Sequence, residues 1–493
     1  SRLFGTIFSL MAAGGGLFAL QQRSRIEVPS AFIYAGSAIS VVFAGDLITV
    51  FIFWELMAIG STLVLWSQGE PTSYKAARRY VMIHLLGGVV LFAGVTGHVL
   101  QTGDVNFQSM HLGSCASYLL LLGFLINAGA PPFSAWLPDA YPEASWSGTV
   151  FLSAFTTKTA VYVLIRGFPG AELLIWVGLF MVFYGIVYAL LENDMRRILA
   201  YSIVNQVGFM ITGIGIGTEM ALNGAAAHAF AHIIYKALLL MSAGSVLMMT
   251  KKRKCSELGG LYHTMPLTMI CGTIGALAIS AFPLTSGFIS KSMISQAAAD
   301  MHLQWVWILL AAASAGVFLH AGIKFPWFVF FQKDSGLRPA EPPISMRAAM
   351  IFFSGLCIGL GIWPDFLYAL LPYTVNYAPY TGAHIVSQLQ LLLFAGLAFF
   401  VMLPFLKRTL TITLDTDWIW REVLPTLATL GLYVCHVVKQ LLLSTIRFFS
   451  NDAISWVKNE QAEGGWFTRT RSTRTMAMWV LVFLLGYLTL YYL

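Results

Sequence analysis

The stretch ALNGAAAHAFAHIIYKALLLMSAGSVLM, residues 221–248, decides the fold class of this chain. A helix rises 1.5 Å per residue, so about 20 apolar residues cross the ~30 Å hydrocarbon core of a bilayer. Similar runs recur along the chain. Hydrophobic residues make up 58% of the 493 residues and charged residues only 10%, whereas a soluble domain is normally about one quarter charged. We therefore expect an all-α polytopic membrane protein.

The positions of the apolar runs predict about fourteen transmembrane segments in a core that spans residues 1–406. We expect helices at residues 3–20, 31–47, 49–66, 79–100, 117–130, 147–168, 172–191, 198–217, 221–248, 264–282, 287–299, 303–332, 347–371 and 385–406.

The net charge of +7 does not indicate a nucleic-acid partner. Basic residues cluster between apolar runs, as at 251–254, where lipid headgroups attract them. The five cysteines are isolated and form no CxxC, zinc or haem-attachment spacing. Composition therefore predicts a lipid bilayer as partner, and neither a metal site nor a bound cofactor.

Prolines interrupt the apolar pattern at residues 130–139 and at 282–287. Proline removes an amide donor, and the freed backbone is tolerated at membrane depth only where it is buried or lines a wet cavity. One broken helix in each half of a chain is typical of transporters built from inverted repeats. We expect those repeats at about 31–191 and 198–371.

The character of the sequence changes after residue 406. Residues 407–475 are polar or amphipathic and predict a surface-lying segment, whereas the apolar run 476–493 predicts a final transmembrane anchor. The pattern leaves open whether 422–446 crosses the membrane or lies flat.

Two charged residues interrupt apolar runs in the first half of the chain. Glu55 lies in FIFWELMA and Lys158 in FTTKTAV. A charge at the centre of a membrane helix costs about 2.5–3.5 kcal/mol on insertion scales, so such groups normally face a polar interior. Opposite charges on neighbouring helices would shift each other's proton affinity. The alternative is a structural ion pair without a transport role.

His228, His232 and Lys236 are spaced i, i+4, i+8, which places them on one helix face over about 12 Å. Such a stripe favours a proton relay over isolated core histidines. Lys291 directly follows the second break and could end a proton path or extend to the membrane interface.

Weaker candidates are His84, His320, Lys324 and Asp139. Lys324 could mark a helix end, and Asp139 is expected to brace the first break. The charged residues at 192–197 predict a solvated turn between helices.

Several of these stretches together resemble the antiporter-like membrane subunits shared by Mrp-type cation/proton antiporters, respiratory complex I and membrane-bound hydrogenases. The resemblance covers about residues 3–421, and residues 372–393 and 414–418 are similar in particular to the D-type Mrp subunit. The matching stretches are FWEL at 53–56, WLPDA at 136–140, RRILAYS at 196–202, KALLL at 236–240 with its histidines, and GFISK at 287–291.

The resemblance implies fourteen core helices, two inverted five-helix repeats and an axis of buried charges. On that axis Glu55 would pair with Lys158, both histidines would bridge toward the central Lys236, and Lys291 would end the path. Many relatives carry histidine where Gln206 stands; glutamine does not titrate, so a proton would need water there or the path would run differently. Relatives also begin with additional helices, so we expect an incomplete N-terminus.

The implied function is that of a proton or cation/proton translocating subunit in the cytoplasmic membrane. Its partners would be other membrane subunits, protons and possibly sodium. It would have no independent catalytic site, even as part of an NADH:quinone oxidoreductase-like complex.

Three alternatives stay open at this point. A redox subunit is disfavoured because His228 and His232 share one helix face. A non-conducting scaffold, or a proton path coupled to a hydrogenase or to inorganic-carbon uptake, would fit the same composition.

Overall fold

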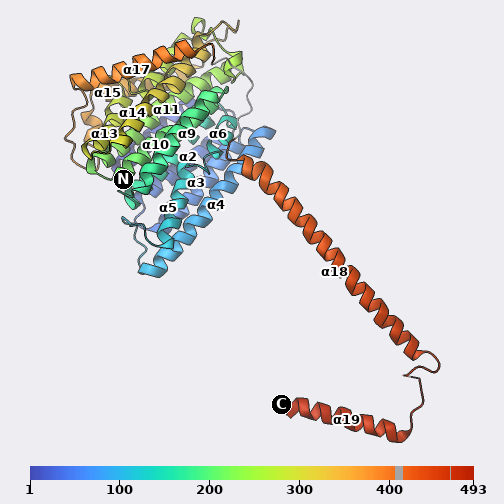
Figure 1. Cartoon of the computed structure of the whole chain (residues 1–493). Helices are drawn as coiled ribbons and strands as arrows, with labels where there is room; N and C mark the ends of the chain where they lie inside the picture. The colour runs from blue at the N-terminus through green and yellow to red at the C-terminus, as the bar shows by residue number, and fades with distance from the viewer. Residues whose placement is uncertain (406–414, 467, 493) are drawn as a thin grey trace. The chain divides into compact units, whose positions relative to one another are not determined.

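A computed structural model describes residues 1–405, 415–466 and 468–492 (Figure 1). The chain divides into two units, Ser1–Asp417 and Trp418–Leu493. Within the described part, twelve helices are long and apolar enough to cross a membrane, and three shorter helices are also apolar. The prediction of an all-α polytopic membrane protein is confirmed, while the number of fourteen segments stays a prediction.

The helices of the first unit follow the predicted order, although the helix predicted at 79–100 begins at residue 71 and the helix predicted at 347–371 ends at residue 362. The first nine are α1 (Arg2–Phe18), α2 (Glu27–Phe43), α3 (Leu47–Trp66), α4 (Pro71–Thr102), α5 (Cys115–Ala128), α6 (Trp136–Ala140), α7 (Gly148–Leu152), α8 (Thr156–Gly167) and α9 (Leu173–Leu191). The others are α10 (Met195–Ile216), α11 (Glu219–Thr250), α12 (Pro266–Ile279), α13 (Ser286–Asp300), α14 (Gln304–Val317), α15 (Ile344–Ile362), α16 (Asp365–Tyr368) and α17 (Gly382–Met402).

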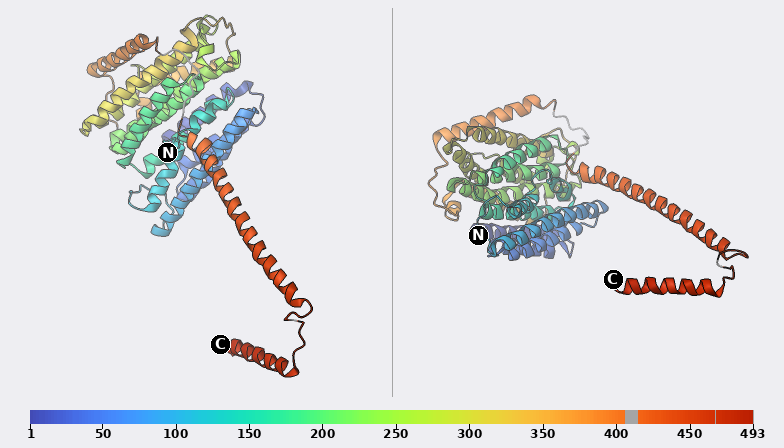
Figure 2. Two further views of the ribbon diagram at one scale, coloured as in Figure 1. Left: turned by 45° about the vertical axis from the view of Figure 1, so that its right-hand side comes forward. Right: turned by 60° about the horizontal axis from the view of Figure 1, so that its bottom comes forward.

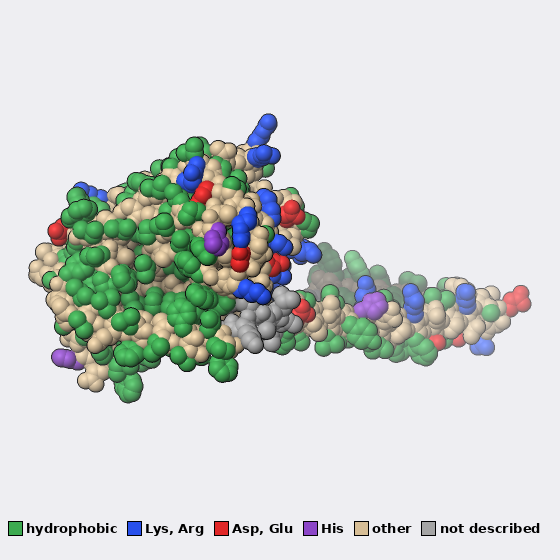
Figure 3. Space-filling view, turned by 90° about the horizontal axis from the view of Figure 1, so that it is seen from above, with side chains coloured by type: hydrophobic (Ala, Val, Ile, Leu, Met, Phe, Trp, Pro, Cys, Tyr) green, Lys and Arg blue, Asp and Glu red, His purple; other side chains and the backbone are tan. Residues whose placement is uncertain are grey.

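Helices α10 and α11 form the centre of this unit. The most apolar window of α10 is buried along its whole length, whereas only 17% of the corresponding window of α17 is buried. The two views in Figure 2 agree that α17 and α4 lie at opposite edges of the bundle. Hydrophobic side chains cover much of the face in Figure 3, and charged side chains gather at one edge. The polar stripe of α11 therefore lies in the interior of the bundle.

Both predicted breaks are present. Helix α5 ends at Ala128 and α6 begins at Trp136, and α12 ends at Ile279 before α13 begins at Ser286. Left-handed backbone turns the chain at Gly129 (φ 78°) in the first break and at Leu284 (φ 67°) in the second. Glycine adopts this conformation without strain. The segment 303–332 is also irregular, because π-helical turns follow α14 at Phe318–Lys324 and Trp327–Phe331.

A third break interrupts the segment that was expected to be one helix at 147–168. Helices α7 and α8 are separated by residues 153–155. Side chains supply partners to the opened backbone, because the Ser153 hydroxyl donates to Val150 O over 2.9 Å and the Thr156 amide donates to the Tyr34 hydroxyl over 2.9 Å. No proline marks this break in the sequence.

The hairpin α3–α4 is repeated by the hairpin α10–α11. Helix α4 begins and ends 148 residues before α11 begins and ends. Each hairpin starts at a capping aspartate, which forms an isolated bridge with a residue 60 positions later, Asp46 with Asn106 and Asp194 with Lys254. A hydrogen bond from the Thr49 amide lowers the pKa of the Asp46 carboxyl.

A buried aspartate fastens the end of the first unit. Asp415 accepts hydrogen bonds from the hydroxyl of Tyr201 over 2.5 Å and from the hydroxyl of Tyr184. Tyr201 belongs to α10 and Tyr184 to α9, so Asp415 is held against two core helices.

The second unit contains α18 (Leu424–Gln461) and α19 (Thr473–Tyr492), and neither helix has a buried residue. Helix α18 extends beyond residue 446, the end of the stretch 422–446 that the sequence left open as crossing the membrane or lying flat. Helix α19 covers most of the predicted anchor at 476–493. Residues 407–414 of the predicted polar segment, together with 467 and 493, lie outside the described residues.

Candidate functional site

The stripe predicted on α11 lies in the interior of the first unit. His228, His232 and Lys236 are all fully buried. The Lys236 ammonium donates to the Ser202 hydroxyl on α10 over 2.9 Å, and His228 Nδ1 lies 3.0 Å from the Ser290 hydroxyl on α13. The stripe therefore faces two neighbouring helices that also carry polar groups.

Gln206 extends the stripe on the α10 side. Its Oε1 accepts a hydrogen bond from the Tyr235 hydroxyl over 3.0 Å and lies 3.1 Å from His228 Nε2. Its amide nitrogen donates to the side chain of Asn205. Because a carboxamide oxygen only accepts hydrogen bonds, His228 Nε2 carries a hydrogen toward Gln206.

His232 is the polar group of the stripe with the fewest contacts. Both of its ring nitrogens are buried, and neither has a hydrogen-bond partner among the residues that the structure describes. Its ring packs edge-on against Tyr235 at 5.3 Å between ring centres. Buried ring nitrogens normally bind a protein group or ordered water, so this position suits a water molecule between Lys236 and His228.

The ammonium groups of two buried lysines, Lys158 and Lys291, reach the carboxyl ends of neighbouring helices. Lys158 donates to Ser153 O at the third break over 2.5 Å and to the Thr157 hydroxyl over 3.0 Å, and Lys291 donates to Ile279 O at the second break over 2.8 Å. The carboxyl end of a helix carries a partial negative charge that stabilises cations. Electrostatic interactions link both lysines to Lys236.

The expected ion pair between Glu55 and Lys158 is not formed. Within the described ranges neither Lys158 nor Lys291 has an ion-pair partner. Lys158 reaches back to the third break, which the sequence did not reveal. Glu55 instead lies over Gly88 on α4, where its Oε1 is 2.0 Å from the point that a Cβ of Gly88 would occupy.

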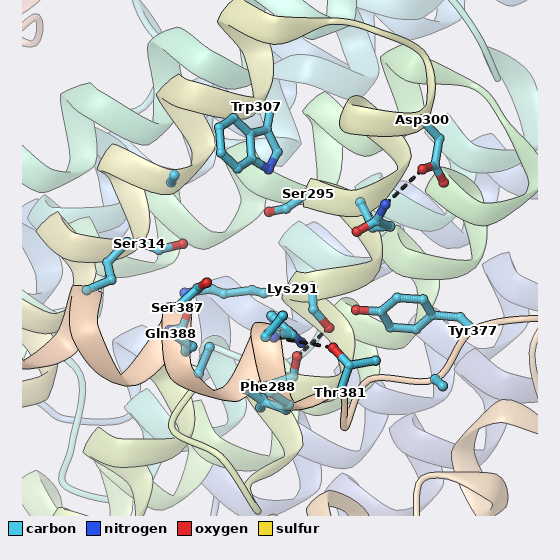
Figure 4. Close-up of a pocket in the computed structure, with 18 of the residues that line it drawn as sticks. Phe288, Lys291, Ser295, Asp300, Trp307, Ser314, Tyr377, Thr381, Ser387 and Gln388 are labelled. Atoms are coloured by element: carbon cyan, nitrogen blue, oxygen red, sulfur yellow. Dashed lines mark hydrogen bonds between the residues drawn. The ribbon is translucent and has the colours of Figure 1, made fainter.

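Lys291 lines a cavity of about 810 Å³ between α13, α14 and α17. Lys291 itself is 3% exposed, whereas Asp300 in the same lining is exposed. Polar side chains that include Ser295, Thr381 and Gln388 surround this space (Figure 4). The cavity therefore connects Lys291 with the exposed end of α13, between walls of mixed polar and apolar side chains.

Two of the weaker candidates, Asp139 and Lys324, make contacts that hold parts of the fold together. Asp139 binds Arg79 through two hydrogen bonds of 2.7 and 2.8 Å and braces the first break. Lys324 is buried on a π-helical turn and donates to three carbonyls at the carboxyl end of α9, at 2.6 to 2.7 Å. His320, one turn earlier, is buried and interacts electrostatically with Lys236.

Several buried charges were missed or misplaced by the sequence analysis, and Glu192 and Asp194 of the turn that was expected to be solvated are among them. Glu27 is fully buried and accepts hydrogen bonds from four side chains: Gln22, Ser67, Ser145 and Ser147. Arg196 was expected in a solvated turn but is only 2% exposed, because it donates to carbonyls of residues 142–145. Nothing in the sequence separates Arg196 from its half-exposed neighbour Arg197.

Comparison with known proteins identifies relatives of this chain. The chain is 31% identical, over 73% of its length, to the A/B subunit of a probable K(+)/H(+) antiporter from Rhizobium meliloti. It is 30% identical to NADH-quinone oxidoreductase subunit M of Pseudomonas aeruginosa over 52% of its length. It spans only 40% and 56% of these two relatives.

A solved structure of the Mrp complex from Dietzia sp. DQ12-45-1b shares the fold, with a TM-score of 0.69 and 22% identity. That similarity covers 75% of this chain and 82% of the other. The family model described as NADH:quinone oxidoreductase/Mrp antiporter, TM, matches residues 44–318. More than half of the chain thus carries the family pattern, including Glu55, Lys158 and the α11 stripe. The chain belongs to the NADH:quinone oxidoreductase/Mrp antiporter transmembrane family.

Proposed function

We propose that this chain translocates protons, or exchanges protons for a cation, as one subunit of a membrane complex of the Mrp antiporter or complex I type. The observation that supports this most is the hydrogen-bonded series from Gln206 through His228 to Ser290. Ser290 directly precedes Lys291, which lines the polar cavity. A titratable stripe on α11 is thereby joined to a lysine with access toward the surface.

The charge would move in steps between lysines. Lys158, Lys236 and Lys291 are close enough to interact electrostatically. Two unit charges interact by about 4 kcal/mol at 4 Å for an effective dielectric constant of 20, so a proton on one lysine changes the proton affinity of the next. Helix carboxyl ends can hold the ammonium groups of Lys158 and Lys291, and the Ser202 hydroxyl that of Lys236, without a fixed carboxylate partner, so the proton can leave.

The proposed setting is the cytoplasmic membrane, with other membrane subunits as partners and protons, possibly with sodium, as substrates. The names of the two relatives support the assignment to a complex, because one is called a subunit of an antiporter and the other a subunit of an NADH-quinone oxidoreductase. A proton path coupled to a hydrogenase or to inorganic-carbon uptake would use the same residues.

Replacement of Lys236 or Glu55 by alanine tests the proposal. In membrane vesicles that contain the assembled complex, we expect both variants to lose ion-coupled transport while assembly persists. Lys75→Ala on α4 is the control, because Lys75 is exposed. Undiminished transport in both test variants would contradict the proposal. Loss of assembly in both would instead indicate a non-conducting scaffold.

A further inference from the structure

We propose that α4 carries a second proton-relay stripe, formed by Tyr80, His84 and the Glu55 carboxylate that lies over Gly88. This inference rests on the proposed function and adds residues to the same path. It supplies the connection between Glu55 and Lys158 that a direct ion pair does not make.

The repeat relates this stripe to the one on α11. The offset of 148 residues between α4 and α11 places Tyr80 opposite His228, His84 opposite His232 and Gly88 opposite Lys236. The three positions of each helix are spaced i, i+4, i+8 and share one face. The middle position is a buried histidine in both helices.

The third position differs between the two helices in a complementary way. Lys236 fills its position on α11 with an ammonium that donates to Ser202 on α10. Gly88 has no side chain, and the Glu55 carboxylate from α3 occupies the space where a Cβ would lie. Helix α3 is the repeat counterpart of α10. A titratable group therefore stands at this point of both stripes, supplied by the neighbouring helix in the first half.

His84 is arranged to accept a proton. It is 1% exposed, and its Nδ1 lies 2.8 Å from Oδ1 of Asn127 on α5. Because an amide oxygen only accepts hydrogen bonds, Nδ1 carries the hydrogen and Nε2 presents a lone pair. In the described part of the chain, neither this Nε2 nor Oε1 of Glu55 has a hydrogen-bond partner.

Two adjacent glycines bring these groups close to the backbone of α4. The Glu55 carboxylate lies over Gly88, and the point that a Cβ of Gly87 would occupy is 3.6 Å from Oδ1 of Asn127 and 3.1 Å from the side chain of Ile126. Two buried polar atoms without protein partners normally share ordered water. Water bound here would carry a proton from Glu55 to His84.

Hydroxyl groups continue the path toward Lys158. The ring of Tyr80 lies 4.1 Å from that of His84 between centres, and its hydroxyl donates to Ser61 over 3.0 Å and also lies against Thr156. Thr156 opens α8, two residues before Lys158. A proton would leave the Glu55 carboxyl, bind His84 Nε2 and pass through bound water to the Tyr80 hydroxyl, which would release its own proton toward Thr156 at the third break.

The test is proton flux through the purified complex in liposomes, with His84→Gln compared against His98→Gln. His98 lies on the same helix but is partly exposed, which makes it a matched control. We expect His84→Gln to lower the flux about tenfold or more, in the range typical of a lost proton-transfer group. Equal flux in the two variants, with both complexes assembled, would overturn the proposal.

A second variant covers a failure of His84→Gln to assemble. Asn127→Leu removes the acceptor that holds Nδ1 and keeps an uncharged side chain of similar length. A fall in flux supports the relay, and unchanged flux refutes it. Lys236→Ala is measured in the same series. If it abolishes flux while His84→Gln does not, only the α4 stripe is wrong; if Lys236→Ala keeps full flux, the proposed function fails.

Discussion

The buried lysines show how single residues are held in this membrane interior. An exposed or partly buried helix terminus stabilises a cation by about 0.3–2 kcal/mol, less than the effective cost of desolvating an ion. Lys158 and Lys291 each have a helix carboxyl end and nearby hydroxyls or an aromatic face, such as that of Phe209 at 4.8 Å from the Lys291 nitrogen. Their charge is therefore only partly compensated, which suits groups that must change protonation.

Gly88→Ala tests the place of the Glu55 carboxylate. The new Cβ would lie 2.0 Å from Oε1, but the carboxylate is the far end of a flexible side chain and can turn away. We expect the thermal stability of the complex to change little and its ion-coupled transport to fall toward that of Glu55→Ala.

The control is Gly36→Ala on α2, because no atom lies within 4 Å of the added carbon. Transport that stays at the original rate in Gly88→Ala would show that Glu55 acts from another position.

At the scale of elements, the breaks in helices place both terminal lysines. The second break depends on close contact between two backbones, because a Cβ on Gly287 would lie 1.9 Å from the carbonyl oxygen of Ala278. A backbone carbonyl cannot move aside as easily as the end of a flexible side chain can. Helix α13 therefore approaches α12 closely enough for Lys291 to reach Ile279 O.

Gly287→Ala is expected to lower the stability of the assembled complex by several degrees in a thermal unfolding measurement, since relief of the overlap must shift α13 and costs roughly 1–3 kcal/mol. Gly355→Ala on α15, where nothing lies within 4 Å, should unfold at the original temperature. Equal unfolding temperatures of the two variants would argue against the close contact.

The sequence predicted most elements and only part of the site. Prolines located the first two breaks, and periodicity placed the α11 stripe correctly on one face. The third break contains neither proline nor glycine, so the carbonyl partner of Lys158 was hidden and an ion pair with Glu55 was expected instead. His84 ranked low because its equivalence to His232 follows from helix bounds that only the structure gives.

At the scale of the whole molecule, the two units differ in how far their helices are buried. The first unit has a continuous core, whereas α18 and α19 contribute no buried residue. A chain that ends at Asp417 is expected to keep the unfolding temperature of the first unit, because burial of apolar surface supplies most of the stability.

The measurement is thermal unfolding of the purified truncated chain beside the full chain, with co-purification of other membrane subunits as a second readout. A truncated chain that folds but recovers fewer partners would assign assembly to residues 418–493. A truncated chain that unfolds at a markedly lower temperature would contradict the division into units.

The hydrogen bonds from Tyr184 and Tyr201 to Asp415 have a mechanical consequence. The hydroxyl groups of two tyrosines on different helices donate to one carboxylate. A force applied to the chain beyond residue 418 would therefore act on these hydrogen bonds before it acts on a transmembrane helix of the core. Tension is then divided between α9 and α10 rather than passed to α17. The hydrogen bonds to Asp415 would in this way limit how far thermal motion of α18 and α19 reaches the stripe of α11.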